Sequence, residues 1–404
     1  MFSLFLLNGL KFNEKYMKYT DLLVGGLCLF CACSSPQKNP IDYVDPFIGT
    51  GFHGHTYPGA TTPFGAVQLS PDTRRGNWDA SSGYHYSDST ILGFSHTHLS
   101  GTGCQDLGDV LLRPTTQPVR LEGEGDIFLP AAFSHDSEKA TPGYYAVTLA
   151  DEQIKVELAA STFAGMHRYT YLNDKDASVI VDLTHILNTD DFIYEAELKQ
   201  TADNEIVGMR RTRSWVDNQY IYFVLQFSKP IQEWQQLNDK QGVAHFGQER
   251  EVLAKVGLSI VSAENARKNL LHDMPDFNFE AVCQQAKAAW EKELAIVNVK
   301  GGTEAQRTNF YTAWYHSLVV PNRTNDINNQ YRRHDSSIAV TPEGKTTYST
   351  FSTWDTFRAW HPLMTLTDTE LVNNMIQSLL NMYEVTGELP IWPLSSGETG
   401  TMIG

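Results

Sequence analysis

The chain has 404 residues, of which 47 are acidic and 31 basic, so its formal net charge at pH 7 is −16. This charge excludes DNA or RNA as a partner, because the chain offers too few cations to neutralise a phosphate backbone. The length favours two or three domains. The 11% of aromatic residues and the 29 glycines indicate a β-rich folded protein with many tight turns.

The N-terminal residues 1–39 resemble an extension followed by a bacterial lipoprotein signal. From Met17 onward, a lysine precedes the short apolar run 22–32, and Cys33 follows as the residue that would carry the lipid. A transmembrane anchor is the alternative, but the run is too short to span a bilayer. We therefore expect export to the periplasm or the cell surface as a lipoprotein whose only membrane attachment is the lipid on Cys33.

Residues 40–270 are predicted to form an antiparallel β-sandwich. Glycine and proline recur so often before Gly108 that long helices are excluded there. Apolar residues then alternate along the chain. The segments that this alternation predicts as strands are 147–149, 154–158, 178–183, 220–227 and 252–260. No helical pattern separates these strands, which is typical of a sandwich, and segment 220–227 is apolar on both faces, as a covered central strand would be.

The pattern changes to helical spacing near Asp276. Behind a cap at Asp276, a helix over residues 277–296 is expected to form a linker that spans residues 271–300. A second helix is predicted from Thr303 to the proline at position 321, which would end it.

A third helix is predicted near the end of the chain. It would begin with the capping box Thr367-x-x-Glu370 and stop at Gly387. Residues 301–404 are therefore expected to be all helix, and to form the first part of a helical domain. Because the sequence breaks off at Gly404 in mid-pattern, we also expect that the chain is truncated.

The segment S-T-F-S-T-W-D-T-F-R-A-W-H, close to the C-terminus, is the strongest candidate for a binding site. A helix with its N-cap at residue 352 or 353 would place Trp354, Asp355 and Arg358 on one face. An indole beside fixed hydrogen-bonding groups suits a sugar, whose ring faces are apolar and whose edges carry hydroxyls. The alternative is a core helix in which Asp355 and Arg358 only pair with each other.

Two histidines form a second candidate. In F-S-H-T-H-L-S-G-T-G-C, an extended backbone would turn His96 and His98 to the same side. Zinc is disfavoured, because no third ligand stands at metal spacing nearby, so hydrogen bonds to a ligand or across a domain interface are preferred. The Ser-Gly-Thr-Gly loop that follows could bring its backbone close to a ligand.

A third cluster of rings and polar groups surrounds Trp78, in the loop G-N-W-D-A-S-S-G-Y-H-Y. Such loops often reach into a cleft, although Trp78 could instead plug the end of the sandwich. Further along the chain, Glu398 lies in a loop rich in serine and glycine. Taken alone, these residues suggest that Asp355 and Glu398 could be the two carboxylates of a glycosidase.

Five motifs in order resemble glycoside hydrolase family 92. They are D-P-F-I-G-T-G, T-T-P-F-G-A-V-Q-L-S-P-D-T, G-F-S-H-T-H-L-S-G-T-G-C, F-S-T-W-D-T-F-R-A-W-H-P-L and G-E-L-P-I-W-P-L-S-S-G-E-T-G-T-M-I-G. The resemblance implies an exo-acting, inverting, calcium-dependent α-mannosidase that removes mannose, chiefly α-1,2-linked, from the ends of glycans. It also implies a β-sandwich joined by linker helices to an (α/α)6 barrel, of which this chain would hold an incomplete part.

The resemblance assigns roles to some of these residues. Trp354, Asp355 and Arg358 would hold the mannose rather than act as acid or base, and Glu398 would line the pocket. The catalytic carboxylates and the calcium ligands would come from segments beyond the M-I-G motif, so the chain alone should be inactive. One departure is the W-P-L at Trp392, where the family commonly has W-E-L.

Two other function classes remain open. One is a surface glycan-binding lipoprotein without catalysis. The other is a polysaccharide lyase, which is disfavoured because no cluster for proton abstraction stands out and because a pocket for an anionic substrate should be more basic.

Overall fold

A computed structural model describes residues 38–121, 127 and 129–402. The expected signal and its lipidation site, Cys33, lie outside these residues. Within the described residues, no helix combines the length and the apolar character that a membrane span requires.

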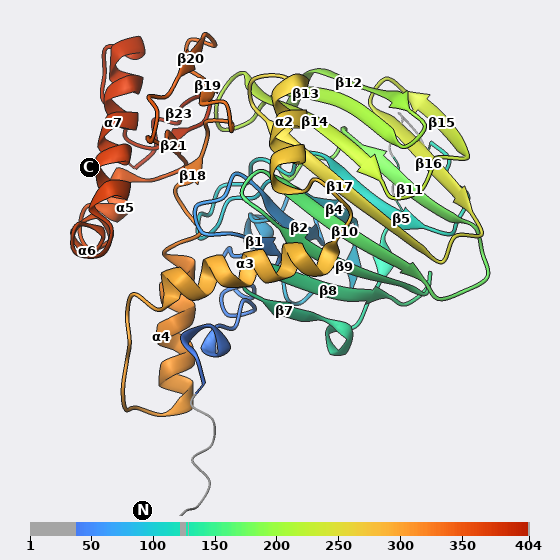
Figure 1. Ribbon diagram of the computed structural model, residues 1–404, viewed down its shortest axis with the longest axis horizontal. Helices are drawn as coiled ribbons and strands as arrows, with labels where there is room; N and C mark the ends of the chain where they lie inside the picture. The colour runs from blue at the N-terminus through green and yellow to red at the C-terminus, as the bar shows by residue number, and fades with distance from the viewer. Residues whose placement is uncertain (1–37, 122–126, 128, 403–404) are drawn as a thin grey trace, which may run out of the picture. The chain divides into compact units, whose positions relative to one another are not determined.

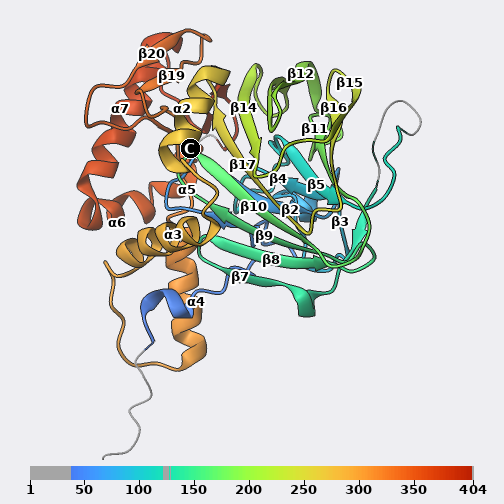
Figure 2. The same cartoon turned by 45° about the vertical axis from the view of Figure 1, so that its right-hand side comes forward.

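Two antiparallel sheets dominate the unit from Pro40 onward (Figures 1 and 2). The seven-stranded sheet has the order β1 (Ala60–Thr61), β2 (Gln68–Asp72), β4 (Gly93–Ser95), β5 (Leu111–Thr115), β11 (Ala177–Asp182), β16 (Gln241–Gly247) and β15 (Glu233–Asn238). The eight-stranded sheet has the order β12 (Phe192–Ala202), β13 (Glu205–Arg213), β14 (Gln219–Phe227), β17 (Glu251–Ser259), β10 (Ala164–Tyr171), β9 (Ile154–Ala160), β8 (Tyr144–Leu149) and β7 (Lys139–Thr141). The five predicted strands are confirmed as β8, β9, β11, β14 and β17.

The inner faces of the two sheets share one apolar core. Phe94 and Val179 of the seven-stranded sheet are buried in the same cluster as Tyr169 and Phe223 of the eight-stranded sheet. Short elements complete this part of the chain. They are β3 (Thr90–Ile91), β6 (Ala131–Ala132), and the 3-10 turns η1 (Pro40–Tyr43), η2 (Trp78–Ala80) and η3 (His135–Ser137).

Two helices cover the outer face of the eight-stranded sheet (Figure 1). Leu270 of α2 (Ala263–Asp273) and Phe279 of α3 (Phe279–Leu294) are buried with Val224 of β14. The prediction that β14 is central and covered on both sides is therefore confirmed. The sequence interpretation missed α2, and it placed the cap of the next helix at Asp276, whereas Asn278 is the residue that caps α3.

The C-terminal part mixes helices with short strands. Its helices are α4 (Glu304–His316), α5 (Thr353–Thr356), α6 (Trp360–Thr367) and α7 (Thr369–Thr386). Its paired strands are β18 (Asn322–Arg323) with β21 (Tyr348–Ser349), β19 (Gln330–Arg332) with β20 (Ile338–Val340), and β22 (Pro393–Leu394) with β23 (Gly397–Glu398). The expectation of an all-helical region is therefore wrong.

The predicted ends of these helices are partly confirmed. Thr303 caps α4, and Gly387 ends α7 with a φ of 78°, a left-handed conformation that glycine adopts without strain. The start of α7 was misplaced by one residue. Asp368, not Thr367, accepts the hydrogen bond from the backbone N–H of Leu371, because Thr367 is the last residue of α6.

A chain of neutral side chains crosses the core between the sheets. His96 Nδ1 donates to the carbonyl of Val110 at 2.7 Å, so its Nε2 must accept a hydrogen bond from Nε2 of His167 at 3.0 Å. The other nitrogen of His167 lies 2.8 Å from the Tyr169 hydroxyl. Burial lowers the pKa of His96 from 6.5 to about 4 and lowers that of His167 as well, because a buried cation would lose its hydration.

This pair predicts acid sensitivity. In the unfolded chain these rings bind protons from pH 6.5 downward, whereas in the folded chain His96 binds a proton only near pH 4. The free energy of unfolding should therefore fall as the pH drops from 6.5 to 4. The slope should be at most about 1.4 kcal/mol per pH unit for each ring. Urea unfolding from pH 7.5 to 4.5 measures it. His96→Gln should flatten the dependence, whereas the exposed His272→Gln should not; equal slopes for both variants would contradict this account.

Candidate functional site

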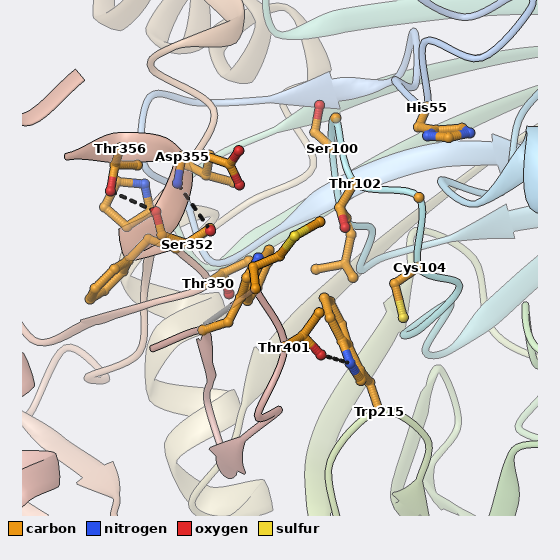
Figure 3. A pocket seen from close by; sticks show the side chains of 18 of the residues that line it. His55, Ser100, Thr102, Cys104, Trp215, Thr350, Ser352, Asp355, Thr356 and Thr401 are labelled. Atoms are coloured by element: carbon orange, nitrogen blue, oxygen red, sulfur yellow. Dashed lines mark hydrogen bonds between the residues drawn. The ribbon is translucent and has the colours of Figure 1, made fainter. Parts of the chain in front are cut away.

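A cavity of about 710 Å³ opens where loops of the two sheets meet the C-terminal segments (Figure 3). The sheet loops contribute His53, His55, Trp78, Leu99, Ser100, Gly101, Thr102, Gly103, Cys104 and Trp215. The C-terminal segments contribute Ser317, Val320, Pro321, Thr350, Phe351, Ser352, Asp355, Thr356, Trp360, Trp392, Thr401 and Met402. The lining thus combines four indoles with hydroxyl groups, which is the mixture that carbohydrate sites use.

Among the described residues, Asp355 is the one aspartate or glutamate in this lining. The Ser352 side chain caps α5 by accepting the backbone N–H of Asp355 at 3.4 Å, so the predicted N-cap is confirmed. Among the described residues, no protein group forms a hydrogen bond or ion pair with the Asp355 carboxylate. The alternative in which Asp355 only pairs with Arg358 is therefore wrong, and the carboxylate is available to a ligand.

Trp354 and Arg358 do not line the cavity. The α-helix ends at Thr356, before Arg358, so the three residues do not share the helical face that the sequence suggested. Trp354 is 42% exposed, with its ring 6.5 Å from that of Phe357, and the Arg358 guanidinium lies 5.9 Å from the same ring. A role for either side chain in sugar binding stays a prediction that this arrangement does not favour.

Glu398 holds a loop together instead of facing the cavity. Its carboxylate accepts the backbone N–H groups of Ile391, Trp392 and Gly400 at 2.7, 3.0 and 2.8 Å. These bonds leave Trp392 packed against Trp215, with ring centroids 4.8 Å apart, and both indoles line the cavity. Glu398 is thus placed to position an aromatic wall, not to act as an acid.

Trp78 lines the cavity, as predicted, on the wall built by the sheet loops. Its indole is 54% exposed and lies between two imidazoles, with the His55 ring 4.4 Å away edge-on and the His53 ring 5.0 Å away. His53 Nδ1 in turn lies 2.6 Å from the Asp79 carboxylate. The Trp78 ring is therefore held in place while one part of it remains accessible, and it does not plug the core.

The Ser-Gly-Thr-Gly loop reaches the cavity, as the sequence suggested. The backbone N–H of Gly101 donates to the carbonyl of His55 at 2.7 Å. A side chain at Gly103 would come within 2.8 Å of the Trp78 indole nitrogen, so only glycine allows this approach. Glycine here serves the packing of the Trp78 wall.

His96 and His98 lie in the interior, and their expected contact with a ligand is not supported. His96 is fully buried and His98 is 1% exposed. His98 places Nδ1 2.7 Å from the carbonyl of Gln68 and Nε2 2.8 Å from the Asp72 carboxylate. Both imidazoles are therefore hydrogen-bonded to protein groups, and these bonds hold the base of the adjacent loop in place.

The buried Asp106 carboxyl group supports the wall that carries Trp215. Asp106 accepts from the backbone N–H of Trp215 and from the Gln219 side chain, and desolvation raises its pKa to about 6. Desolvation likewise raises the pKa of Asp191 to about 7, and that of the Cys104 thiol to about 12. The thiol is therefore a poor nucleophile at neutral pH.

Sequence reasoning missed several lining residues. His53, His55 and Trp215 lie outside the candidate segments, so only the fold brings them to the cavity. Trp360 and Thr401 lie within two of the quoted motifs but were not singled out.

Family models match almost all of the described chain. The model of the glycosyl hydrolase family 92 N-terminal domain matches residues 43–259, and that of the family 92 catalytic domain matches residues 265–404. The chain belongs to glycosyl hydrolase family 92.

Solved structures and a curated relative agree with this assignment. A family GH92 α-mannosidase from Bacteroides thetaiotaomicron superposes with a TM-score of 0.85 at 35% identity, over 91% of this chain and 53% of that one. A family GH92 inverting mannosidase from the same organism gives 0.79 at 27% identity, over 92% and 52%. An uncharacterised secreted glycosidase from Arthroderma benhamiae is 27% identical over 360 residues, which are 76% of this chain and 45% of that protein. The chain thus spans about half the length of these family 92 relatives.

We predict that Glu398 contributes to the stability of the aromatic wall. Glu398→Ala should remove three charge-assisted hydrogen bonds and lower the free energy of unfolding by about 1–2 kcal/mol, since the carboxylate is exposed and partly screened. Urea unfolding measures the change. Glu388→Ala, which replaces an exposed carboxylate ten residues earlier in the same region, is the matched control. Equal effects of the two substitutions would contradict this role.

Proposed function

We propose that this chain binds the terminal mannose of glycans as part of a family 92 α-mannosidase. The proposal is carried by the Asp355 carboxylate, which has no hydrogen-bond or ion-pair partner in the described part of the chain and faces a cavity lined by Trp78, Trp215, Trp360 and Trp392. The α-mannosidase from B. thetaiotaomicron supports the choice of sugar, because a structure of that protein is a complex with mannoimidazole.

The residues of the cavity suit a hexose. Indole faces pack against the apolar faces of the sugar ring, and the Asp355 carboxylate accepts hydrogen bonds from its hydroxyls. The hydroxyl groups of Ser100, Thr102 and Thr350 add groups that both donate and accept. The cavity would thus orient the sugar and exclude water from its apolar faces.

Hydrolysis requires a second carboxylate. In an inverting glycosidase, one carboxyl group protonates the leaving oxygen and another activates water. As far as the structure describes the chain, the cavity lining holds a single one, Asp355, and Glu398 is bound to backbone N–H groups. We therefore propose that this chain binds the sugar. The acid–base pair of an inverting mechanism and the preference for α-1,2 linkages would require further residues. The 404 residues alone would then bind the glycan without cleaving it.

Calcium is the metal expected for the family. Ca²⁺ takes six to eight oxygen ligands, several of them carboxylates. Within the described part of the chain, no group of three or more His, Cys, Asp or Glu residues could hold a metal ion. The described residues therefore do not fit calcium, and no step is assigned to it.

The remaining expectations concern architecture and location. We propose that the two sheets form the family's sandwich domain, that residues 301–404 belong to its (α/α)6 barrel, and that the boundaries at residues 270 and 300 separate them. Export is supported by the secreted A. benhamiae relative. Lipidation of Cys33 rests on the sequence pattern alone.

Asp355→Asn should weaken the binding of mannose about tenfold or more, because the hydrogen bonds that a charged acceptor makes are about twice as strong as neutral ones. Titration calorimetry with mannose measures the change. Asp335→Asn, which alters an exposed carboxylate outside the cavity, should leave the affinity unchanged. The same affinity for both variants would remove Asp355 from the site.

We also predict that the purified 404-residue chain releases no mannose from α-1,2-linked mannobiose above the uncatalysed rate. The reason is that the described residues place a single carboxylate in the cavity lining. Chromatography of the products over a long incubation, with added calcium, measures this. Release of mannose that a chelator abolishes would overturn the proposal.

A further inference from the structure

A second cavity, of about 730 Å³, lies where β12 forms the edge of the eight-stranded sheet (Figure 1). We call it the β12 groove; Met209 and Tyr222 lie in its floor, and Glu195 and Glu197 at its rim. The register pairs Glu197 with Met209 and Met209 with Tyr222, so these side chains form one row across three strands. The row is on the outer face of the sheet, because Val224, two residues after Tyr222, packs against α2 there.

Aromatic rings continue the groove toward the turn between β13 and β14. The rings of Tyr220 and Tyr222 lie 6.4 Å apart and nearly parallel, with an angle of 5° between them. The Arg211 guanidinium lies 5.8 Å from the Tyr220 ring and 4.9 Å from the Tyr194 ring. Tyr194 and Phe192, with ring centroids 5.1 Å apart, are 40% and 52% exposed. The groove therefore ends in accessible rings, which offer the kind of surface on which a sugar packs.

The turn between β13 and β14 joins the β12 groove to the cavity that Asp355 lines. This turn carries Trp215, whose indole is part of the wall of the Asp355 cavity. From Met209 to Trp215 the chain advances by roughly 20 Å, at about 3.3 Å per residue of extended strand. A ligand that occupies both places must therefore be several sugar units long.

The charges of the β12 groove select a neutral ligand. Glu195, Glu197 and Asp239 line it, and Lys199 is the one lysine or arginine that the described residues place in the lining. Carboxylates accept hydrogen bonds from sugar hydroxyls but repel uronates and phosphates. An added peptide strand is disfavoured, because the backbone N–H of Leu198 on the strand edge already donates to the carbonyl of Asp239 at 3.0 Å.

We propose that the β12 groove binds the inner units of a neutral mannose chain whose terminal unit lies in the Asp355 cavity. Sugar rings pack on Tyr222 and Tyr194, and the Glu197 carboxylate accepts hydrogen bonds from their hydroxyls. This inference rests on the proposed function and adds that the protein distinguishes long glycans from short ones. Because two sites then hold one ligand, α-mannan binds more tightly than mannose.

The test combines affinity electrophoresis of the full 404-residue chain in gels that contain neutral α-mannan with calorimetry using mannose. Tyr222→Ala and Tyr194→Ala should each weaken the binding of mannan about three- to tenfold, the contribution of one packed ring, and leave the affinity for mannose within about twofold. Asp355→Asn should weaken the binding of both. Tyr383→Ala, which removes a 49% exposed tyrosine outside both cavities, should change neither.

Two further measurements keep a folding defect apart from a lost contact. Tyr222→Phe keeps the ring and should bind mannan within about twofold of the unchanged chain. Glu197→Gln, at an exposed position, should weaken the binding of mannan about twofold or more, because a neutral acceptor makes weaker hydrogen bonds. A loss of mannose affinity in Tyr194→Ala equal to its loss of mannan affinity would contradict a separate groove.

The outcomes separate the two proposals. Unchanged mannan binding in both Tyr222→Ala and Tyr194→Ala would overturn the inference alone, and so would polygalacturonate that binds as tightly as mannan. A dimer, or a complex with an oligolysine peptide, that Tyr222→Ala abolishes would assign the groove to a second copy or to a cationic peptide instead. Failure of the unchanged chain to bind mannose would overturn the proposed function.

Discussion

The site depends on the packing of one indole, Trp290, between the sheets and the C-terminal helices. Trp290 of α3 is fully buried, its Nε1–H donates to the carbonyl of Thr61 in β1 at 2.7 Å, and its ring lies 4.4 Å from Tyr315 of α4. Around it, Tyr57 and Phe351 share one apolar cluster. Because this apolar cluster includes residues from the segments on both sides of the cavity, its packing fixes the distance between the two cavity walls.

Glu398 and Asp355 lie in neighbouring segments of the site but have different roles. Glu398 lies in a short hairpin of two-residue strands, which has too few backbone hydrogen bonds of its own to hold a bulky pair of indoles. Its carboxylate supplies the missing bonds. Asp355 follows an N-cap that already satisfies the start of its helix, so its own side chain is left for a ligand. The position of a carboxylate relative to backbone N–H groups therefore decides whether it is structural or free.

Sequence patterns were informative wherever one physical rule acted over a long segment. Alternating apolar residues located β9, and a run that is apolar on both faces located β14, which lies between the core and the helices that cover the sheet. The rule failed for the region of β18 to β23, where two- and three-residue strands are too short to show a period. It failed again at α5, because a four-residue helix cannot carry residue 358 on its face.

The site itself was only partly accessible to sequence reasoning, and the reason is physical. Trp78 and Asp355 could be recognised because their chemistry suits a sugar in any exposed setting. His55 could not, because no local pattern marks it and only the fold brings its ring against Trp78 at the cavity. His96 and His98 show the converse: two residues of suitable chemistry were assigned to a ligand, yet Val110, His167, Gln68 and Asp72 already satisfy them. Suitable chemistry therefore marks a ligand site only where the fold also leaves the residue's hydrogen-bonding capacity unused, and that is a property of the surroundings rather than of the residue.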